Sequence, residues 1–311
     1  MPLIRLSVHP ETGRAALHAS PQSAVAALRR AASGHGPIII MVHGYKYDPT
    51  QAATCPHRKI FNAENGWPAA LRAIDNQALG IAFGWRARGP LRDVFNAAGL
   101  LGKELAEIVG KLCQAAPHRP LHLIAHSMGA EVALAALCQS PAGSISRVIL
   151  LTAASFQSHA ALALSSPAGC RAELINVVSR ENDLFDFAFE RLVSGNNDSD
   201  RTLGHGLVAS NALTVQLDCP ATLLALTRLD VPIAPSRRRV CHWSGYTRPG
   251  ALAFYARLMQ SPSALPLSTL REALPTGSCP SLVTAFACSG GQKAHHGAGL
   301  IPEERHHEPT D

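Results

Sequence analysis

The chain has 311 residues, 47% of them hydrophobic and 16% charged, with a formal net charge of +6 at pH 7. It is long enough for a large core, yet no apolar run approaches the roughly 18 residues that would span a bilayer, so stable membrane insertion is not expected. The mild positive charge and the 5% aromatic content also argue against nucleic-acid binding, which uses a basic stripe with interleaved aromatic rings.

The first third of the chain predicts alternating strands and helices. Residues 1–8 alternate like an edge strand and lack the apolar core of a signal peptide, so a cytoplasmic protein is expected. Residues 37–45 contain a β-branched run, which is typical of a strand buried on both faces. The other elements predicted here are helices over 23–32, 67–76 and 91–112 and a strand over 79–85.

The same alternation continues beyond residue 120. Such a pattern predicts a mostly parallel central sheet with helices on both faces. Residues 184–211 have no clear periodicity and predict a surface excursion or a small cap or lid. The remaining predicted elements are a strand that begins at 121, a helix over 130–137, a strand over 148–151, a helix over 160–164, strands over 173–179 and 212–218, and a helix over 250–259.

The composition changes after about residue 260. Residues 1–260 are interpreted as one domain, whereas 261–311 form an extension rich in Pro, Ser, Gly and His, whose end is expected to be disordered. The eight cysteines are scattered without Cys-x-x-Cys spacing, so neither a disulfide framework nor a zinc site is expected. The histidine pairs at 295–296 and 306–307 leave open a metal-linked role for the extension.

The stretch from Leu121 to Gly129 carries the most specific motif. An apolar strand ends abruptly at Ala125-His126-Ser127-Met128-Gly129, and a helix-forming segment follows. A strand, a sharp turn with a central serine and a helix are the setting of a nucleophile elbow. The residues two before and two after the serine must be small there. Ser127 is therefore the candidate nucleophile, and the Met128 amide is expected to face the incoming carbonyl group.

A second oxyanion donor is expected where the early strand ends at His43-Gly44. In hydrolases with a nucleophile elbow, the loop after an early strand supplies this amide, and glycine lets the backbone approach the substrate oxygen. The donor is then the Tyr45 amide or that of Gly44. The loop over 46–67 is long for a connection and is expected to line a pocket wall. Gly44, His126 and Tyr47 are the residues expected to contact the substrate.

A serine nucleophile needs a base within hydrogen-bonding reach, and the base needs an orienting group. The acid is expected in the polar turn after the strand over 173–179, where Asp183 is the first candidate, Asp186 its nearest rival and Glu181 a third. His242 lies after the last strand and just before the final helix and is the expected base. His205, between two glycines, is its competitor.

Taken together, these residues resemble the α/β-hydrolase superfamily, specifically an uncharacterised bacterial branch of lipase-like and esterase-like proteins. The resemblance covers about residues 36–260 and does not extend to the tail. It implies the α/β-hydrolase fold, in which nucleophile, acid and base follow one another along the chain in that order. The matching segments are 42–45, 83–85, 121–129, the Asp183 turn and His242 before the last helix.

The resemblance implies a serine hydrolase that cleaves a carboxylic ester or a related acyl bond through a Ser127-His242-Asp183 triad and an acyl-enzyme intermediate. The expected partner is a small-molecule acyl substrate, with no cofactor and no metal required. Ester, thioester and amide substrates are not distinguished, and the oligomeric state stays open. The alternative from another class is a catalytically inactive protein of this fold that serves as a binding or scaffold protein.

Overall fold

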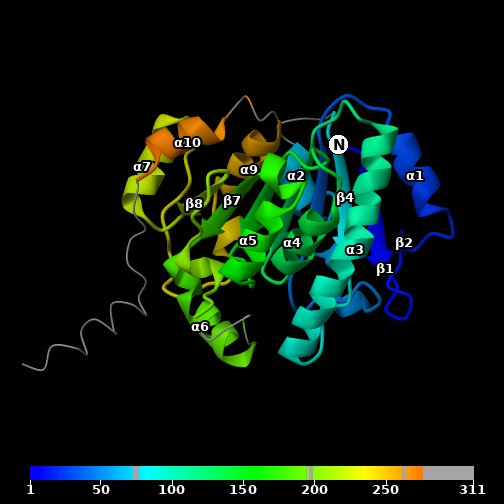
Figure 1. Ribbon diagram of the computed structural model, residues 1–311, viewed down its shortest axis with the longest axis horizontal. Helices are drawn as coiled ribbons and strands as arrows, with labels where there is room; N and C mark the ends of the chain where they lie inside the picture. The colour runs from blue at the N-terminus through cyan, green and yellow to red at the C-terminus, as the bar shows by residue number, and fades with distance from the viewer. Residues whose placement is uncertain (73–76, 194, 196–198, 261–262, 264, 276–311) are drawn as a thin grey trace, which may run out of the picture.

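Eight strands form one sheet in the computed structural model, in the order β2-β1-β4-β3-β5-β6-β7-β8 (Figure 1). The structure describes the chain except for residues 73–76, 194, 196–198, 261–262, 264 and 276–311. All neighbouring strands are parallel apart from β1 and β2. The strands are β1 Leu3–Val8, β2 Ala15–Leu17, β3 Ile38–Val42, β4 Leu79–Gly84, β5 Leu121–His126, β6 Arg147–Leu151, β7 Glu173–Val178 and β8 Ala212–Gln216.

Helices cover both faces of this sheet, because its central strands carry apolar side chains on both sides. One apolar cluster joins the sheet to α1, α3, α4 and α5, and a second joins its other face to α2, α7, α9 and α10. The helices are α1 Ala24–Ala31, α2 Trp67–Arg72, α3 Leu91–Ala115, α4 Gly129–Gln139, α5 Gln157–Ser165, α6 Asp183–Leu192, α7 Pro220–Arg228, α8 Ser244–Thr247, α9 Ala251–Gln260 and α10 Leu267–Ala273.

This architecture confirms the predicted α/β-hydrolase fold with a mostly parallel sheet. No helix in the described part of the chain is long and apolar enough to cross a membrane. The described core also continues past residue 260, since Leu265, Leu267 and Leu270 are buried in the second cluster. The expected disorder at the end of the extension, and its histidine pairs, lie outside the described residues.

Two predictions about single elements were wrong. Residues 1–8 were expected to form an edge strand, but β2 pairs antiparallel with β1 and takes the edge itself. Residues 184–211 were expected to be irregular, but their first part belongs to α6. This helix buries only a narrow stripe that includes Asp186 and Phe189, and several of its apolar side chains are exposed, so its apolar residues do not mark the side that packs on the core.

The carboxyl ends of the parallel strands lie at the lower side of Figure 1, where α6 is also found. Parallel strands end at the same edge, and ligands of open α/β sheets bind there. The turns after β3, β5 and β7 and the loop before α8 therefore meet at this edge, although they are far apart in the sequence.

Four buried histidines make the stability of the fold depend on pH. Burial lowers the pKa of His43 and His126 to about 4 and that of His57 and His122 to about 3, from 6.5. Because these folded-state values lie below the unfolded one, the unfolded chain binds more protons below pH 6.5. The stability present above pH 6.5 is therefore lost as the pH falls towards about 4.

We expect the urea midpoint of unfolding to fall steadily between about pH 6.5 and 5, a range in which ordinary carboxylates remain mostly ionised. Replacing His122 with leucine should flatten this dependence, because the variant has one buried imidazole fewer. The exposed His118 offers the matched control, and His118→Gln should leave the slope unchanged. A midpoint that stays constant over this range would contradict the prediction.

Candidate active site

Ser127 lies in the sharp turn between β5 and α4. Its φ of 54° is in the left-handed region, which non-glycine residues adopt at a cost and mostly where surrounding structure enforces it. Two backbone hydrogen bonds hold it there, from the Ser127 amide to the Leu151 carbonyl at 3.1 Å and from the Ala154 amide to the Ser127 carbonyl at 3.1 Å. This is the backbone geometry expected of a nucleophile elbow.

Small residues around the turn are required by close approach of the backbone. A Cβ atom on Gly129 would lie 2.5 Å from the His43 carbonyl oxygen, and one on Gly44 would lie 2.5 Å from Ser127 Cβ. Ala125 is fully buried within β5. The elbow and the loop after β3 are thus pressed against each other, with no room for a side chain at position 44.

His242 is the side chain next to the Ser127 hydroxyl. Its Nε2 atom lies 2.8 Å from Ser127 Oγ, and its Nδ1 atom lies 2.6 Å from Asn182 Oδ1. Burial, the nearby His126 and the Lys46 ammonium hold the pKa of His242 well below 6.5, so the ring is neutral at pH 7. Because an amide oxygen only accepts, Nδ1 carries the proton and Nε2 is left to accept from Ser127.

The backbone of His242 is fixed by two donors. Its carbonyl oxygen accepts hydrogen bonds from His126 Nε2 at 3.0 Å and from Thr152 Oγ1 at 3.1 Å. The His126 and His242 rings lie 4.7 Å apart. His126, predicted as a substrate contact, therefore helps to hold the His242 backbone in place.

The orienting group at His242 Nδ1 is Asn182, where the sequence predicted Asp183. Asn182 ends a short 3-10 turn over Arg180–Asn182, and Asp183 begins α6. Successive residues of a helical turn point about 100° apart, so these two neighbours cannot face the same ring. Asp183 lines a separate small cavity with Glu190 and His205.

His205, the competing base, is engaged elsewhere. Its Nε2 atom lies 2.6 Å from Arg201 Nη2 and 3.4 Å from Glu190 Oε1. Burial and the Arg201 guanidinium lower the pKa of His205. Of the two histidines considered, the structure brings only His242 to Ser127.

The loop after β3 is held by a buried histidine. His43 accepts a hydrogen bond at Nε2 from the Trp85 amide at 3.0 Å, and its carbonyl accepts one from Trp85 Nε1 at 3.0 Å. Its Nδ1 atom lies 2.9 Å from the Gly44 carbonyl oxygen. These contacts fix the loop that leads to Tyr45, and Tyr45 lines the same cavity as Ser127 and Met128.

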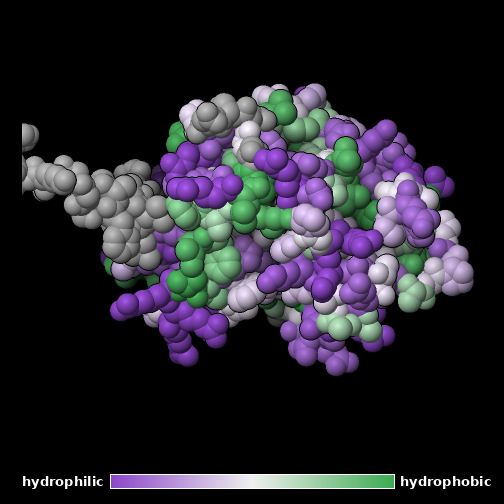
Figure 2. Space-filling model, turned by 90° about the horizontal axis from the view of Figure 1, so that it is seen from below, coloured by the Kyte–Doolittle hydropathy of each residue, from purple (hydrophilic) through white to green (hydrophobic). Residues whose placement is uncertain are grey.

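A cavity of about 460 Å³ opens in front of Ser127. Its walls include Leu91, Ala154, Phe185 and Phe189, so they are largely apolar. Two lysines, Lys46 and Lys59, and Tyr47 also line it. In Figure 2, which shows the molecule from below, apolar residues gather on the part of this face where α6 lies.

The exposed apolar side chains of α6 and the neighbouring Trp243 account for part of that surface. They are Leu184, Phe185, Phe187, Leu192 and Trp243. As for metals, no group of three or more His, Cys, Asp or Glu side chains within the described residues could hold an ion.

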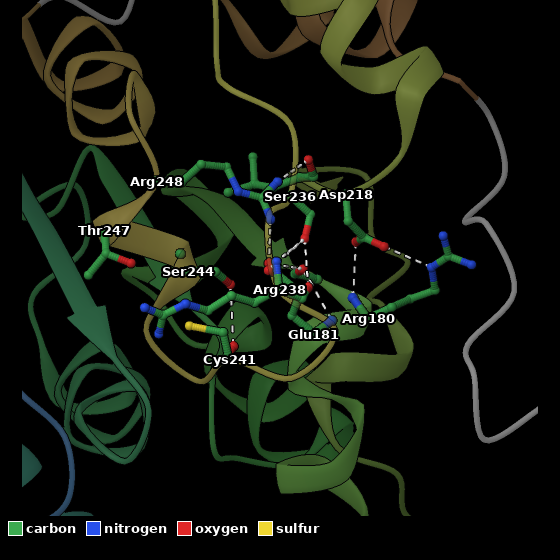
Figure 3. A network of polar contacts seen from close by, with 12 residues as sticks. Arg180, Glu181, Asp218, Ser236, Arg238, Cys241, Ser244, Thr247 and Arg248 are labelled. Carbon is green, nitrogen blue, oxygen red and sulfur yellow. Dashed lines mark hydrogen bonds and ion pairs between the residues drawn. The ribbon is translucent and has the colours of Figure 1, made fainter.

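A buried polar network ties the Asn182 turn to the His242 loop (Figure 3). Glu181 forms an ion pair with Arg248 and accepts a hydrogen bond from Ser236 Oγ at 2.7 Å. The Glu181 carbonyl accepts from the Cys241 amide at 2.8 Å. Glu181, the third candidate acid, therefore has a structural position next to the site rather than a contact with the His242 ring.

The two side chains that the structure brings together, Ser127 and His242, were both predicted from the sequence by motif and chain order. Asn182 was missed, because an amide is not the residue type sought beside a catalytic histidine. A signal was nevertheless present, since Asn182 follows β7 directly in the turn where an acid was expected. Only the side-chain directions decide which residue of that turn meets the ring.

A family model described as "Alpha/beta hydrolase of unknown function (DUF900)" matches residues 19–152. This range includes the loop after β3 and the elbow but ends before Asn182 and His242. No curated protein sequence is significantly similar to the chain.

Solved structures with partial similarity include an acetyl xylan esterase and a cutinase, both of Trichoderma reesei. The catalytic core domain of its acetyl xylan esterase is 14% identical, with a TM-score of 0.28, and the match covers 39% of this chain and 65% of that one. Its cutinase, in complex with a C11Y4 phosphonate inhibitor, is 16% identical, with a TM-score of 0.27 and coverage of 42% and 65%. The chain thus matches less than two thirds of each, and overlaps this small do not identify a substrate.

Proposed function

We propose that this chain, which has the α/β-hydrolase fold and matches an α/β-hydrolase family model over residues 19–152, is a serine hydrolase acting on a carboxylic ester. The single observation that carries the proposal is the line of contacts Ser127 Oγ–His242 Nε2 at 2.8 Å and His242 Nδ1–Asn182 Oδ1 at 2.6 Å. A serine hydroxyl is a poor nucleophile unless an adjacent base is oriented to take its proton, and this arrangement supplies both groups.

In the proposed reaction, Ser127 Oγ attacks the carbonyl carbon while its proton passes to His242 Nε2. Asn182 keeps the second imidazole proton on Nδ1, so that Nε2 is the basic nitrogen, and its amide oxygen accepts from the imidazolium that forms. His242 then protonates the leaving alcohol. Water, deprotonated by the same histidine, releases the acyl group and restores Ser127.

The negative charge on the substrate oxygen requires donors that are already in position. The Met128 amide is one candidate, because it precedes the first turn of α4, where backbone N–H groups have no acceptor within the helix. The Tyr45 amide is the other, since Gly44 brings that loop against Ser127. In well-studied hydrolases one such donor contributes about 10²–10³ in rate.

The cavity walls favour a substrate with an apolar acyl group. Phe185, Phe189 and Leu91 offer apolar surface beside Ser127, in a cavity of about 460 Å³. Burial of apolar surface stabilises a bound chain by roughly 25 cal/mol per Å². A cationic leaving group is disfavoured, because Lys46 and Lys59 line the same cavity.

The test is labelling by a fluorophosphonate probe, followed by hydrolysis of p-nitrophenyl esters from acetate to octanoate. We expect the probe to attach at Ser127 and the hydrolysis rate to rise from acetate to the medium-length esters. His242→Ala should reduce labelling by roughly 10³-fold or more. The matched variant His205→Ala should label like the wild type, and a result in which it alone fails would move the base. A folded wild-type protein that neither labels nor hydrolyses esters would favour a binding or scaffold protein.

A further inference from the structure

The contacts behind His242 do not end at Asn182. Asp186 accepts a hydrogen bond from the Asn182 side chain. Asn182 and Asp186 are four residues apart, at the start and in the first turns of α6, and side chains at this spacing lie on one face of a helix. Both are buried, with exposed fractions of 2% and 6%. The serine, the imidazole, the amide and the carboxyl group thus form one continuous line.

The order of donors along this line fixes the direction of the amide. An asparagine side chain can be turned either way, with oxygen and nitrogen exchanged. When Asp186 is ionised, its carboxylate only accepts, so the amide nitrogen then faces Asp186 and the oxygen faces His242. If the amide turned over, its NH₂ group would face Nδ1, the ring proton would move to Nε2, and His242 could no longer accept from Ser127.

We propose that Asp186 is a positioning residue of this site, which sets the direction of the Asn182 amide and thereby the tautomer of His242. The inference rests on the proposed function, because it assigns Asp186 a purpose only if His242 acts as a base towards Ser127. Asp186 lines the same cavity as Ser127 and His242, and its proposed effect on the His242 ring is transmitted through Asn182.

The surroundings of Asp186 fit a position kept for function rather than for stability. Among the described residues no basic side chain forms an ion pair with it. Gly204 packs directly on its carboxyl group, where a Cβ atom would collide with it. Burial raises the pKa of Asp186 to about 8, so the folded state disfavours its charged form. A buried acid without a cationic partner costs stability, and such groups concentrate at functional sites.

This placement has a consequence for the pH dependence. Around pH 8 the Asp186 carboxyl loses its proton, and the resulting charge lies one amide away from the imidazolium that forms in the transition state. Opposite charges at close range stabilise each other. The rate of reaction at Ser127 should therefore rise through about pH 8, on top of a plateau at lower pH where the protonated carboxyl still accepts from Asn182.

The experiment compares Asp186→Asn, which keeps an acceptor but removes the charge, with Asp186→Leu, which removes both. The second-order rate of fluorophosphonate labelling and the kcat and KM for p-nitrophenyl butyrate are measured from about pH 6 to 9. Asp186→Leu should lower kcat and the labelling rate roughly 10- to 100-fold with KM nearly unchanged, the size of effect expected of a misplaced catalytic group. Asp186→Asn should keep most of the rate at pH 6–7 but lose the rise near pH 8.

The matched control is Glu190→Gln, an acid-to-amide change one turn further along α6, where Glu190 pairs with Arg201 at 3.1 Å. It should keep the wild-type rate, and because the Glu190 charge helps to raise the pKa of Asp186, it should move the rise to a lower pH without removing it. The inference is overturned if the wild type labels at Ser127 while Asp186→Asn retains the rise near pH 8, or if Glu190→Gln causes the same losses. A wild-type protein that does not label at all contradicts the proposed function instead.

Discussion

Replacing Ser127 with alanine is expected to abolish fluorophosphonate labelling and to lower ester hydrolysis by roughly 10⁴–10⁶-fold. The variant loses the Oγ atom that His242 contacts at 2.8 Å and gains nothing that can attack a carbonyl carbon. Its fold should be preserved, because the backbone hydrogen bonds of residue 127 with Leu151 and Ala154 do not involve the hydroxyl. Hydrolysis of p-nitrophenyl butyrate and circular dichroism measure the two parts of this prediction.

Ser155 provides the control for a second buried serine near the elbow. Its hydroxyl donates to Glu131 Oε2 at 2.6 Å and is fully buried, so it has no access to a substrate. Ser155→Ala should label normally even if it is somewhat less stable. Labelling that persists in Ser127→Ala but disappears in Ser155→Ala would refute the assignment of the nucleophile.

Replacing Arg248 with methionine is expected to destabilise the protein by about 3–5 kcal/mol, the usual cost of leaving a buried charge without its partner. Glu181 and Arg248 are 5% and 6% exposed and form an ion pair. Arg248 also donates to the Leu217 carbonyl. The variant should lose labelling as well, since Glu181 holds the turn before Asn182 against the loop before His242. Urea unfolding at pH 7 gives the free energy of unfolding directly.

A second ion pair nearby, in which only the arginine is partly exposed to solvent, serves as the comparison. Arg180 lies 2.7 Å from Asp218 Oδ2, with 35% of its side chain exposed. Arg180→Gln should cost about 1 kcal/mol or less, as measured for solvent-accessible ion pairs. Asp218 keeps its hydrogen bonds from the Arg180 amide and from Gln216 in that variant. Equal losses in Arg180→Gln and Arg248→Met would show that burial is not the deciding factor.

The sequence was most informative for segments whose structure depends on residues that are close together in the chain. β5, the strained turn and α4 follow one another within about twenty residues. The turn requires small side chains at positions 125 and 129, and the sequence has alanine and glycine there. The buried parallel strands were predictable for the same reason, because a short β-branched run indicates a strand without information about the segments that pair with it. His242 was found from its place after the last strand.

The orienting group could not be found this way. Choosing among Glu181, Asn182, Asp183 and Asp186 requires the direction of four side chains in a turn that passes from 3-10 to α-helical geometry. A one-residue change in where α6 begins would rotate each of them by about 100°. The preference for a carboxylate then selected Asp183, although the structure turns it into another cavity.

Elements with weak or mixed periodicity were missed for a related reason. β2 has three residues and depends on β1 for its existence. α6 exposes Leu184, Phe187 and Leu192, so its apolar residues do not mark its buried side. α7 did carry a readable signal, a proline in its first turn at Pro220.

The contact between Ser127 and His242 joins residues 115 positions apart. During synthesis, Ser127, the proposed nucleophile, emerges long before His242, the proposed base. A chain that stops anywhere before the loop ahead of α8 therefore has a serine of ordinary reactivity, whatever the state of its sheet. Under the proposed function, Ser127 becomes reactive only once the Glu181–Arg248 pair holds the His242 loop in place, so labelling at Ser127 is expected to report that this part of the chain has folded.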